Sequence, residues 1–385
     1  MSNKIRVAVL YGGRSGEHEV SLMSAANVIQ YLDRSRFEVV PIGIDKQGVW
    51  FLGDDTLRKE LNAPKTLELL RDSDRMLFNP DYIGRNFQAV QASQLISHLK
   101  KSERLFDVIF PVIHGTLCED GTVQGLLELA EIPYVGCGVL ASAVGMDKDV
   151  SKRLVMNAGM QVAPFVVIKR GQWNCEPKHF CDLVTQQLKY PVFVKPANTG
   201  SSVGVEKIKS ADELHDAINR AFQYDTKVLV EEGINAREIE VAVLESLEYG
   251  KDPILSIPGE VRPTHEFYSY AAKYLDEKGA ELMIPAPLSE ELQARVQQFA
   301  KNIFAVLECE GMARVDLFLE KNTNEIYFNE VNTIPGFTQI SMYPKLMAAT
   351  GVSYPELLTH LVMLAINRHK LKSELSRECQ ETFVS

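Results

Sequence analysis

Two short apolar stretches near the C-terminal end of the chain, 313–319 and 325–331, constrain the fold most strongly. Both are rich in the Val, Leu, Ile, Phe and Tyr residues that favour β-strands, and the polar segment between them, 321–324, is typical of a turn. We therefore predict an antiparallel hairpin. Because side chains alternate between the two faces of a strand, four polar residues can share one face: Arg314, Asp316, Glu330 and Asn332.

A turn centred near Thr323 places Asp316 opposite Glu330 and Arg314 opposite Asn332. This register is sensitive, because a slip of one residue moves every side chain to the other face. Two opposed carboxylates repel each other unless a cation lies between them, and together with an amide they form the oxygen-only set that Mg²⁺ prefers. A solvated polar strand face is the alternative interpretation of the same residues.

The segment after the hairpin, 333–338, contains Pro and Gly and is typical of a turn. Such a turn can return a backbone N–H group to the polar face, as an oxyanion-binding site requires. The arginine on that face also suits an anionic reaction intermediate. Together these features favour a reaction centre.

The 385 residues are enough for two or three domains with sizeable cores, and the apolar content of 45% and charged content of 24% are ordinary for a soluble globular protein. The net charge of −10, with no basic tract, argues against a nucleic-acid partner. No stretch is apolar enough for a signal core or for membrane insertion, so a cytoplasmic protein is expected. The 6 cysteines show no metal-type or redox spacing and are expected to be reduced.

The N-terminal region is expected to begin with a βαβ unit, formed by a strand at 5–11, a helix at 19–32 and a strand at 37–44. Glycines at the first strand–helix junction could cradle a phosphate, but no full G-x-G-x-x-G is present, and a tight turn explains them equally well. A buried strand at 106–113 ends at His114, where α/β proteins place ligands, although a lone loop histidine is more often structural. A helix at 122–131 follows.

A second cluster begins where a strand at 191–195 delivers Lys195 to a loop of small residues, 200–204. Glycine and serine allow backbone N–H groups to approach phosphate oxygens, and the lysine supplies positive charge. The loop is not a Walker motif, because it lacks G-K-[ST]. A flexible linker is the alternative, but the return to alternating apolar residues at 203–208 favours a phosphate-binding loop between two strands.

Weaker periodic patterns predict the helices and strands in the rest of the chain. Helices are expected at 139–144, 178–188, 211–222, 292–307 and 354–368, strands at 162–168, 228–234 and 236–244, and a loop with many aromatic residues at 263–282. Residues 46–104 have no clear periodicity and are left unassigned. The acidic residues Glu231, Glu232 and Glu238 could be only a solvated strand face, and Lys148 could be an ordinary surface lysine.

Several motifs in collinear order, spread over residues 5 to 369, resemble the D-alanine–D-alanine ligase family of the ATP-grasp superfamily. They are GGRSGEHEVS at 12–21, the His-Gly…Glu-Asp-Gly pattern at 114–121, Lys195 with GSSVG at 200–204, Arg-Val-Asp at 314–316, and NEVNTIPGFT at 329–338. The resemblance implies an α/β fold with a parallel-sheet N-terminal domain, 1–145. Two further units, 146–228 with the glycine-rich loop and 229–385 with the metal site and covering loop, would sandwich ATP between antiparallel sheets.

The family resemblance implies that ATP drives the ligation of two D-alanine molecules through a D-alanyl phosphate, as a step in peptidoglycan precursor synthesis in the cytoplasm. The implied cofactors are ATP and two Mg²⁺ or Mn²⁺ ions, the implied small-molecule partner is D-alanine, and a homodimer is the family habit. A D-alanine–D-lactate ligase, a ligase for another D-amino acid and a non-catalytic ATP-binding regulator are the alternatives.

By the same resemblance, Glu17 would bind the ammonium group of the first D-alanine, and His114 would lie near its carboxylate. Ser201 and Tyr274 would connect to Glu17 through hydrogen bonds, and a tyrosine at 274 favours the dipeptide over the D-lactate ester. The oxyanion of the tetrahedral intermediate and the second D-alanine would be held by Arg314, the Gly336 N–H and Ser341.

The remaining implied roles concern the nucleotide and the metal ions. The residues expected at the phosphates are Lys148, Lys195, Ser201, Ser202, Val203 and Lys273. Those expected at the adenine, the ribose and the rest of the nucleotide are Glu231, Glu232, Ile234, Glu238, Asn329 and Glu330. The expected metal ligands are Asp316, Glu330 and Asn332.

Overall fold

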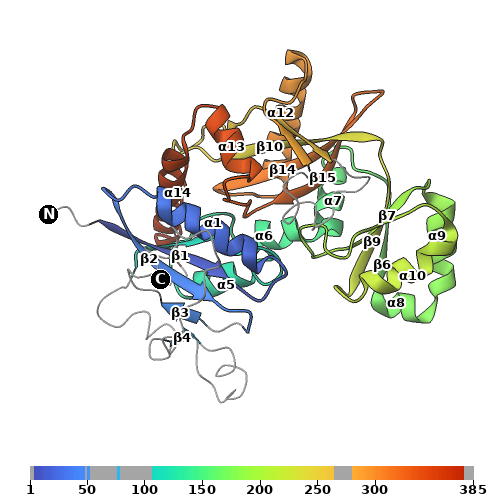
Figure 1. Ribbon diagram of the computed structural model, residues 1–385, viewed down its shortest axis with the longest axis horizontal. Helices are drawn as coiled ribbons and strands as arrows, with labels where there is room; N and C mark the ends of the chain where they lie inside the picture. Colours follow the sequence, from blue (N-terminus) through green and yellow to red (C-terminus); the bar gives the residue numbers. More distant parts are fainter. Residues whose placement is uncertain (1–3, 48–49, 53–75, 79–105, 264–279, 377–385) are drawn as a thin grey trace, which may run out of the picture.

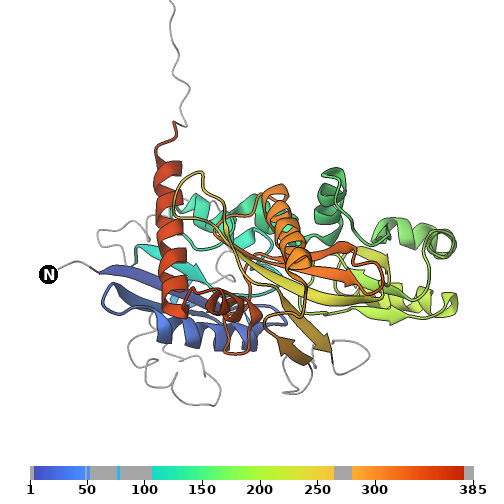
Figure 2. The same ribbon diagram turned by 90° about the horizontal axis from the view of Figure 1, so that it is seen from above.

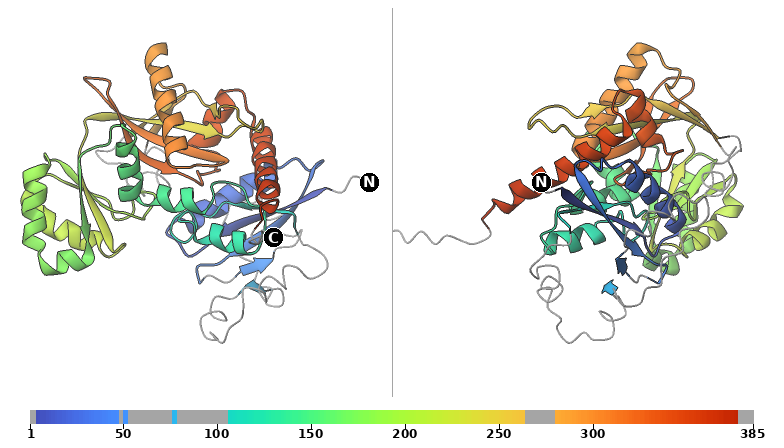
Figure 3. Two further views of the ribbon diagram at one scale, coloured as in Figure 1. Left: turned by 180° about the vertical axis from the view of Figure 1, so that it is seen from behind. Right: turned by 60° about the vertical axis from the view of Figure 1, so that its left-hand side comes forward.

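The computed structural model describes residues 4–47, 50–52, 76–78, 106–263 and 280–376. Three β-sheets lie in a row, with a parallel sheet at one end, a four-stranded sheet at the other and a six-stranded sheet joining them (Figure 1). The views in Figure 3 show the same arrangement from behind and from the side. No helix in these ranges combines the length and apolarity needed to cross a membrane.

The N-terminal sheet has the strand order β4-β3-β2-β1-β5. Its strands are β1 (Ile5–Gly12), β2 (Phe37–Ile44), β3 (Trp50–Leu52), β4 (Met76–Phe78) and β5 (Val108–Pro111). The first strand pairs in parallel with β2 and β5, which confirms the predicted βαβ opening, and β3 and β4 add an antiparallel edge. The accompanying helices are α1 (His18–Tyr31), α5 (Thr122–Leu129) and α6 (Val139–Met146).

The four-stranded sheet is antiparallel, with the order β6-β9-β7-β8. Its strands are β6 (Phe165–Lys169), β7 (Val192–Pro196), β8 (Glu206–Ile208) and β9 (Lys227–Glu232), and its helices are α8 (Arg170–Cys175), α9 (Pro177–Gln187) and α10 (Ala211–Ala221). Apolar residues from all three helices, including Trp173, Val184 and Leu214, pack with the inner face of the strands to form one core. Lys195 and Glu231 lie on the opposite face, because they alternate with the core residues Val194 and Val230.

The six-stranded sheet has the order β13-β12-β10-β14-β15, and β11 pairs with β10. Its strands are β10 (Ala236–Leu244), β11 (Ile254–Leu255), β12 (Gly259–Pro263), β13 (Ala280–Met283), β14 (Met312–Glu320) and β15 (Ile326–Asn332). The helices near it are α7 (Lys148–Asn157), α12 (Glu290–Val306), α13 (Met342–Ala349) and α14 (Tyr354–Ser373). One core joins α7 and α12 to β10, β14 and β15.

The strands β14 and β15 form the predicted hairpin, and the predicted register holds where the polar residues lie. Asp316 pairs with Glu330 and Arg314 with Asn332, but a β-bulge shifts the register toward the turn. The bulge inserts one extra residue between Phe328 and Glu330. Because of that insertion, Phe328 and Val331 can both face the core while Glu330 keeps the face of Asp316.

The last helix, α14, packs against α1 and β5 of the N-terminal unit, and its upright position beside the parallel sheet is visible from above (Figure 2). Arg368 donates hydrogen bonds to the carbonyls of Gly136 (2.6 Å) and Tyr134 (2.8 Å), and its guanidinium lies 4.6 Å from the centre of the Tyr134 ring. Lys372 forms an ion pair with Glu128 at 2.8 Å. These contacts hold α14 against residues 128–136 of the N-terminal unit.

Two predicted strands begin later than expected. The strand predicted from residue 162 begins at Phe165, and Val162 only bridges Phe328. The strand predicted from residue 203 begins at Glu206, because left-handed backbone at Ser201, Ser202 and Gly204 keeps the preceding loop out of the sheet. The central part of the predicted loop 263–282 and most of 46–104 lie outside the described residues.

Candidate active site

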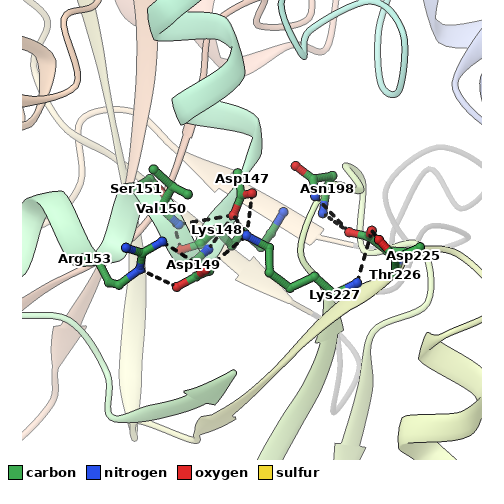
Figure 4. A network of polar contacts seen from close by, with 10 residues as sticks. All are labelled: Asp147, Lys148, Asp149, Val150, Ser151, Arg153, Asn198, Asp225, Thr226 and Lys227. Atoms are coloured by element: carbon green, nitrogen blue, oxygen red, sulfur yellow. Dashed lines mark hydrogen bonds and ion pairs between the residues drawn. The ribbon is translucent and has the colours of Figure 1, made fainter. Parts of the chain in front are cut away.

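The N-terminus of α7 is fixed to the four-stranded sheet by a closed network of charges (Figure 4). The carboxylate of Asp147 caps the helix by accepting hydrogen bonds from the N–H groups of Asp149 and Val150, both at 3.1 Å. The ammonium of Lys227, on β9, lies 2.6 Å from Asp147 and 3.0 Å from Asp149. This network holds Lys148, the first residue of α7, at the edge of the crevice.

The small-residue loop is anchored at its base by the same region. Asn198 donates hydrogen bonds from its backbone and its side chain to Asp225, at 2.8 and 2.9 Å (Figure 4). Lys148 donates from Nζ to the carbonyl of Thr199 at 2.6 Å. Ser201 and Ser202 have φ values of +51° and +60°, a conformation that non-glycine residues rarely adopt outside functional loops.

Glu17, from the loop before α1, meets this small-residue loop. The Ser201 hydroxyl donates a hydrogen bond to the Glu17 carboxylate, as the sequence resemblance implied. A Cβ atom at either Gly115 or Gly200 would lie 2.9 Å from Glu17 Oε2. The Glu17 carboxylate can therefore occupy this position because neither residue 115 nor residue 200 has a side chain.

Lys195 ends in a buried ion-pair cluster. Its Nζ lies 3.3 Å from Oε1 of Glu231, and the Nζ of Lys152, on α7, lies 3.2 Å from Oε2 of the same carboxylate. Burial alone would raise the pKa of Glu231, but the two lysines lower that pKa below its ordinary value. Burial lowers the pKa of Lys152 against the opposing effect of Glu231.

The polar face of the hairpin carries opposite charges in contact. Arg314 donates hydrogen bonds to both carboxylate oxygens of Asp316 at 2.7 Å, and its guanidinium lies 3.0 Å from Glu240. Burial alone would lower the pKa of Arg314, but Asp316 and Glu240 raise that pKa above its ordinary value. Asn332 donates to Asp316 at 2.9 Å, and Glu330 lies 3.4 Å from the ammonium of Lys148. Arg314, Asp316 and Asn332 are thus in contact, and Glu330, paired with Asp316 across the strands, contacts Lys148.

The hairpin residues fit a hard divalent cation by their chemistry. Asp316 and Glu330 are directly opposed, partly buried carboxylates, and Asn332 adds an amide oxygen to an oxygen-only donor set. In the described part of the chain, no group of three or more His, Cys, Asp or Glu residues could hold a metal ion. The candidate metal site therefore depends on two carboxylates and an amide.

His114 is buried beside the turn that follows the hairpin. Its Nδ1 lies 3.1 Å from the carbonyl of Ile334 and 3.8 Å from Glu119, and its Nε2 lies 3.2 Å from the hydroxyl of Ser24. Burial alone would lower the pKa of His114, but Glu119 raises that pKa above its ordinary value. Glu119 also accepts a hydrogen bond from the Gly115 N–H at 2.9 Å.

The turn at 334–338 is held by hydroxyl groups. The Phe337 N–H donates to Ser24 at 3.2 Å, and the Thr338 N–H donates to Ser341 at 2.9 Å. A Cβ atom at Gly336 would lie only 2.7 Å from the Ser341 hydroxyl. Gly336 and Ser341, both predicted at the site of amine attack, are therefore neighbours.

A small cavity marks the junction of the three units. It is lined by Glu119, Met146, Lys148, Gly200, Glu330 and Asn332, among others. A second hollow is bordered by Glu232, Ile234, Met160 and Tyr327. The predicted nucleotide residue Glu238 lies on β10 opposite Phe318, and Asn329 lies at the bulge. Lys273 and Tyr274 lie outside the described residues.

Some residues at the site were missed by the sequence interpretation. Lys152 lies one helical turn from Lys148, so helical spacing from a known site lysine could have indicated it. Ser24 contacts His114 from a segment far away in the sequence, and no local pattern indicates such a contact. Glu119 lies in the same loop as His114, within the His-Gly…Glu-Asp-Gly pattern, but the sequence interpretation assigned it no role.

Two antiparallel sheets that face each other across lysines and carboxylates, joined to a parallel-sheet unit, define the class of ATP-grasp ligases. The family described as "D-ala D-ala ligase N-terminus" matches residues 6–137, and the family described as "D-ala D-ala ligase C-terminus" matches residues 154–363. The chain belongs to the D-alanine–D-alanine ligase family.

Similar proteins cover nearly the whole chain. A D-alanine–D-alanine ligase A of Bradyrhizobium diazoefficiens is 52% identical over 381 residues, covering 98% of this chain and 99% of its own. A D-alanine–D-alanine ligase of Caldicellulosiruptor bescii is 46% identical, covering 97% and 98%. Among solved structures, the VanG D-Ala:D-Ser ligase of Enterococcus faecalis has a TM-score of 0.77 at 36% identity, with 94% and 100% covered. The Coxiella burnetii D-alanine–D-alanine ligase has a TM-score of 0.75 at 34% identity, with 97% of each chain covered.

Proposed function

We propose that this chain performs its ligation with the residues gathered at the three-way junction. The reaction is the ATP-dependent, ADP-forming joining of two D-alanine molecules to D-alanyl-D-alanine, a building block for the cell wall. This function is supported above all by one relative, a D-alanine–D-alanine ligase A that is 52% identical over 98% of this chain.

The N-terminal unit, 1–145, supplies the first D-alanine site. Glu17 receives the substrate ammonium, because a buried carboxylate is a strong partner for an amine cation. Ser201 holds that carboxylate. The family resemblance assigns Tyr274 to the same hydrogen-bonded chain. His114, kept in place by Glu119, lies toward the substrate carboxylate.

The units 146–228 and 229–385 hold ATP between them. Lys148, Lys195, Lys273 and the loop residues Ser201, Ser202 and Val203 bind the phosphates. The strand end Glu231, Glu232 and Ile234 presents backbone groups to the adenine, and Glu238 binds the ribose hydroxyls. Asn329 and Glu330 complete the nucleotide site beside the hairpin.

The chemistry needs no covalent enzyme intermediate. A carboxylate oxygen of the first D-alanine attacks the γ-phosphorus of ATP, ADP leaves, and a D-alanyl phosphate forms. The amine of the second D-alanine then attacks the carbonyl carbon, and phosphate leaves with one former carboxylate oxygen. Arg314 and the Gly336 N–H stabilise the oxyanion, and Ser341 holds the carboxylate of the second D-alanine.

Asp316, Glu330 and Asn332 are the residues that would hold two Mg²⁺ or Mn²⁺ ions. Such ions, when bound, neutralise charge on the phosphates during phosphoryl transfer. For the chain itself, the consequence is that Arg314 and Lys148 must share these carboxylates with the cations.

The second substrate is the point on which related ligases differ, and the VanG structure is that of a D-Ala:D-Ser ligase. The test is to incubate the purified protein with ATP, Mg²⁺ and D-alanine, alone and with equimolar D-serine or D-lactate, near neutral pH. Mass spectrometry of the products should show D-alanyl-D-alanine in every mixture. A predominant mixed product would reject the dipeptide assignment.

We further propose a cytoplasmic homodimer whose partners are small molecules. Gel filtration with light scattering tests the dimer directly, and a monomer mass at micromolar concentration would contradict it.

A further inference from the structure

Lys152 is a charged side chain with no access to solvent. It lies on α7 with an exposed fraction of 0%, and its carboxylate partner Glu231 is 1% exposed. The ammonium also donates a hydrogen bond to the carbonyl of Phe328 at 3.3 Å and lies 5.7 Å from the centre of that ring. Lys152 therefore connects α7, β9 and β15 without reaching the crevice.

The same carboxylate is shared by Lys195, which is 9% exposed and so lies closer to the crevice. The ion-pair distances from Glu231 to Lys152 and to Lys195 are 3.2 and 3.3 Å. Two ammonium groups and one carboxylate leave a net charge of +1. If Lys152 were absent, Glu231 would neutralise Lys195, and the cluster would offer no net charge to an anion.

We propose that Lys152 is a positioning residue that satisfies Glu231 and thereby leaves the charge of Lys195 available to the phosphates of the nucleotide. This inference rests on the proposed nucleotide site. It assigns Lys152 no contact with the ligand, because its side chain is closed off by Glu231 and Phe328. It also explains why two lysines converge on one buried carboxylate.

The decisive comparison is between ligands with and without phosphates. Lys152→Met removes the charge and leaves an unbranched side chain that is shorter by one atom. The dissociation constant for ADP, measured by calorimetry with Mg²⁺, should rise about tenfold or more, because a charge-assisted contact is weakened. The dissociation constant for adenosine should stay within about twofold, since adenosine lacks the phosphates.

A second substitution separates charge from architecture. In Lys152→Met/Glu231→Gln the carboxylate that competes for Lys195 is gone, so ADP affinity should return to within about threefold of the wild type. This double variant also has no unpaired buried carboxylate, so it should fold even if Lys152→Met alone does not. Lys372→Met, which breaks the distant ion pair with Glu128, is the matched control and should leave ADP affinity unchanged.

The proposal would be overturned if Lys152→Met weakened the binding of ADP and of adenosine equally. It would also be overturned if adding Glu231→Gln did not restore the affinity for ADP. Circular dichroism establishes that each variant is folded. Binding and ligation are measured separately. A wild-type protein that binds ADP but makes no dipeptide would contradict the proposed function. The role of Lys152 would still be tested by the ADP affinities of the variants.

Discussion

At the scale of single residues, the position of the Glu17 carboxylate depends on the absence of side chains around it. Gly200→Ala would place a Cβ atom 2.9 Å from Glu17 Oε2. Because the carboxylate must shift, about 1.4 kcal/mol of D-alanine binding should be lost, and the KM for D-alanine should rise about tenfold. The KM for ATP should stay nearly constant. Steady-state kinetics with each substrate varied in turn measures both constants.

The control for Gly200→Ala is Gly125→Ala on α5, where an added Cβ atom has nothing within 4 Å. This variant should keep both constants and gain about 0.5–1 kcal/mol in stability, because alanine favours a helix over glycine. A Gly200→Ala enzyme with an unchanged KM for D-alanine would contradict the assignment of Glu17.

Glu330 tests the hairpin site. Glu330→Gln keeps the shape but removes one of the two opposed carboxylates, so kcat should fall by about 10² or more. The matched control is Glu325→Gln at the exposed end of the same hairpin, where the carboxylate only accepts from Tyr327. Undiminished turnover in Glu330→Gln would refute the metal assignment.

Alternation along two strands was enough to predict that Arg314, Asp316, Glu330 and Asn332 share a face, because that property is local. The contacts of Lys152 with Glu231 and of Ser24 with His114 could not be predicted in the same way. Each contact joins two segments that are far apart in the sequence, and such contacts are decided by packing and not by periodicity.

At the scale of elements, the hairpin could be predicted but its bulge was overlooked. The signal was present, because Phe328 and Val331 are three residues apart, and strict alternation cannot bury both. The late start of β8 has a comparable cause. The apolar residues at 203 and 205 predict a strand there, but the strand β8 begins only at Glu206. The left-handed backbone at Ser201 and Ser202 keeps the residues before Glu206 out of the sheet.

The strand β12 is held beside β10 by a buried carboxylate. Glu260 accepts from Arg237 at 2.8 and 2.9 Å and from Arg262 at 3.1 Å. Burial alone would raise the pKa of Glu260, but the two arginines lower that pKa below its ordinary value. The folded state therefore binds fewer protons than the unfolded state in the interval between the two pKa values.

It follows that the Glu260 contribution to stability is complete above the ordinary carboxyl pKa and is lost as the pH falls through the lowered one. Glu260→Gln should reduce the free energy of unfolding at pH 7 by about 2 kcal/mol and flatten its decline in acid. Urea unfolding from about pH 7 to pH 3 measures both effects, with Glu38→Gln, at the exposed position of β2, as the control. An unchanged acid decline in Glu260→Gln would contradict this account.

At the scale of the whole molecule, the C-terminal helix returns to the N-terminal unit, so the proposed substrate and nucleotide residues come from units that are packed together. The helix α14 docks on the N-terminal unit through Arg368, and one apolar core runs from β1 and α1 to α13 and α14. The family resemblance implied a parallel-sheet unit followed by two antiparallel sheets, and the three sheets of the structure agree with it. The contact of Glu17 with Ser201 could be expected only from the family resemblance, because nothing local links these two loops.

The central claim is that the carboxylate of D-alanine is activated by the nucleotide within this junction. The most direct measurement uses D-alanine labelled with ¹⁸O in its carboxylate, with ATP and Mg²⁺, and follows the released phosphate by mass spectrometry, with L-alanine as the control. We expect one labelled oxygen in each phosphate released with D-alanine, and little phosphate release with L-alanine. Unlabelled phosphate would show that water, not the amino acid, attacks ATP, and would contradict the central claim.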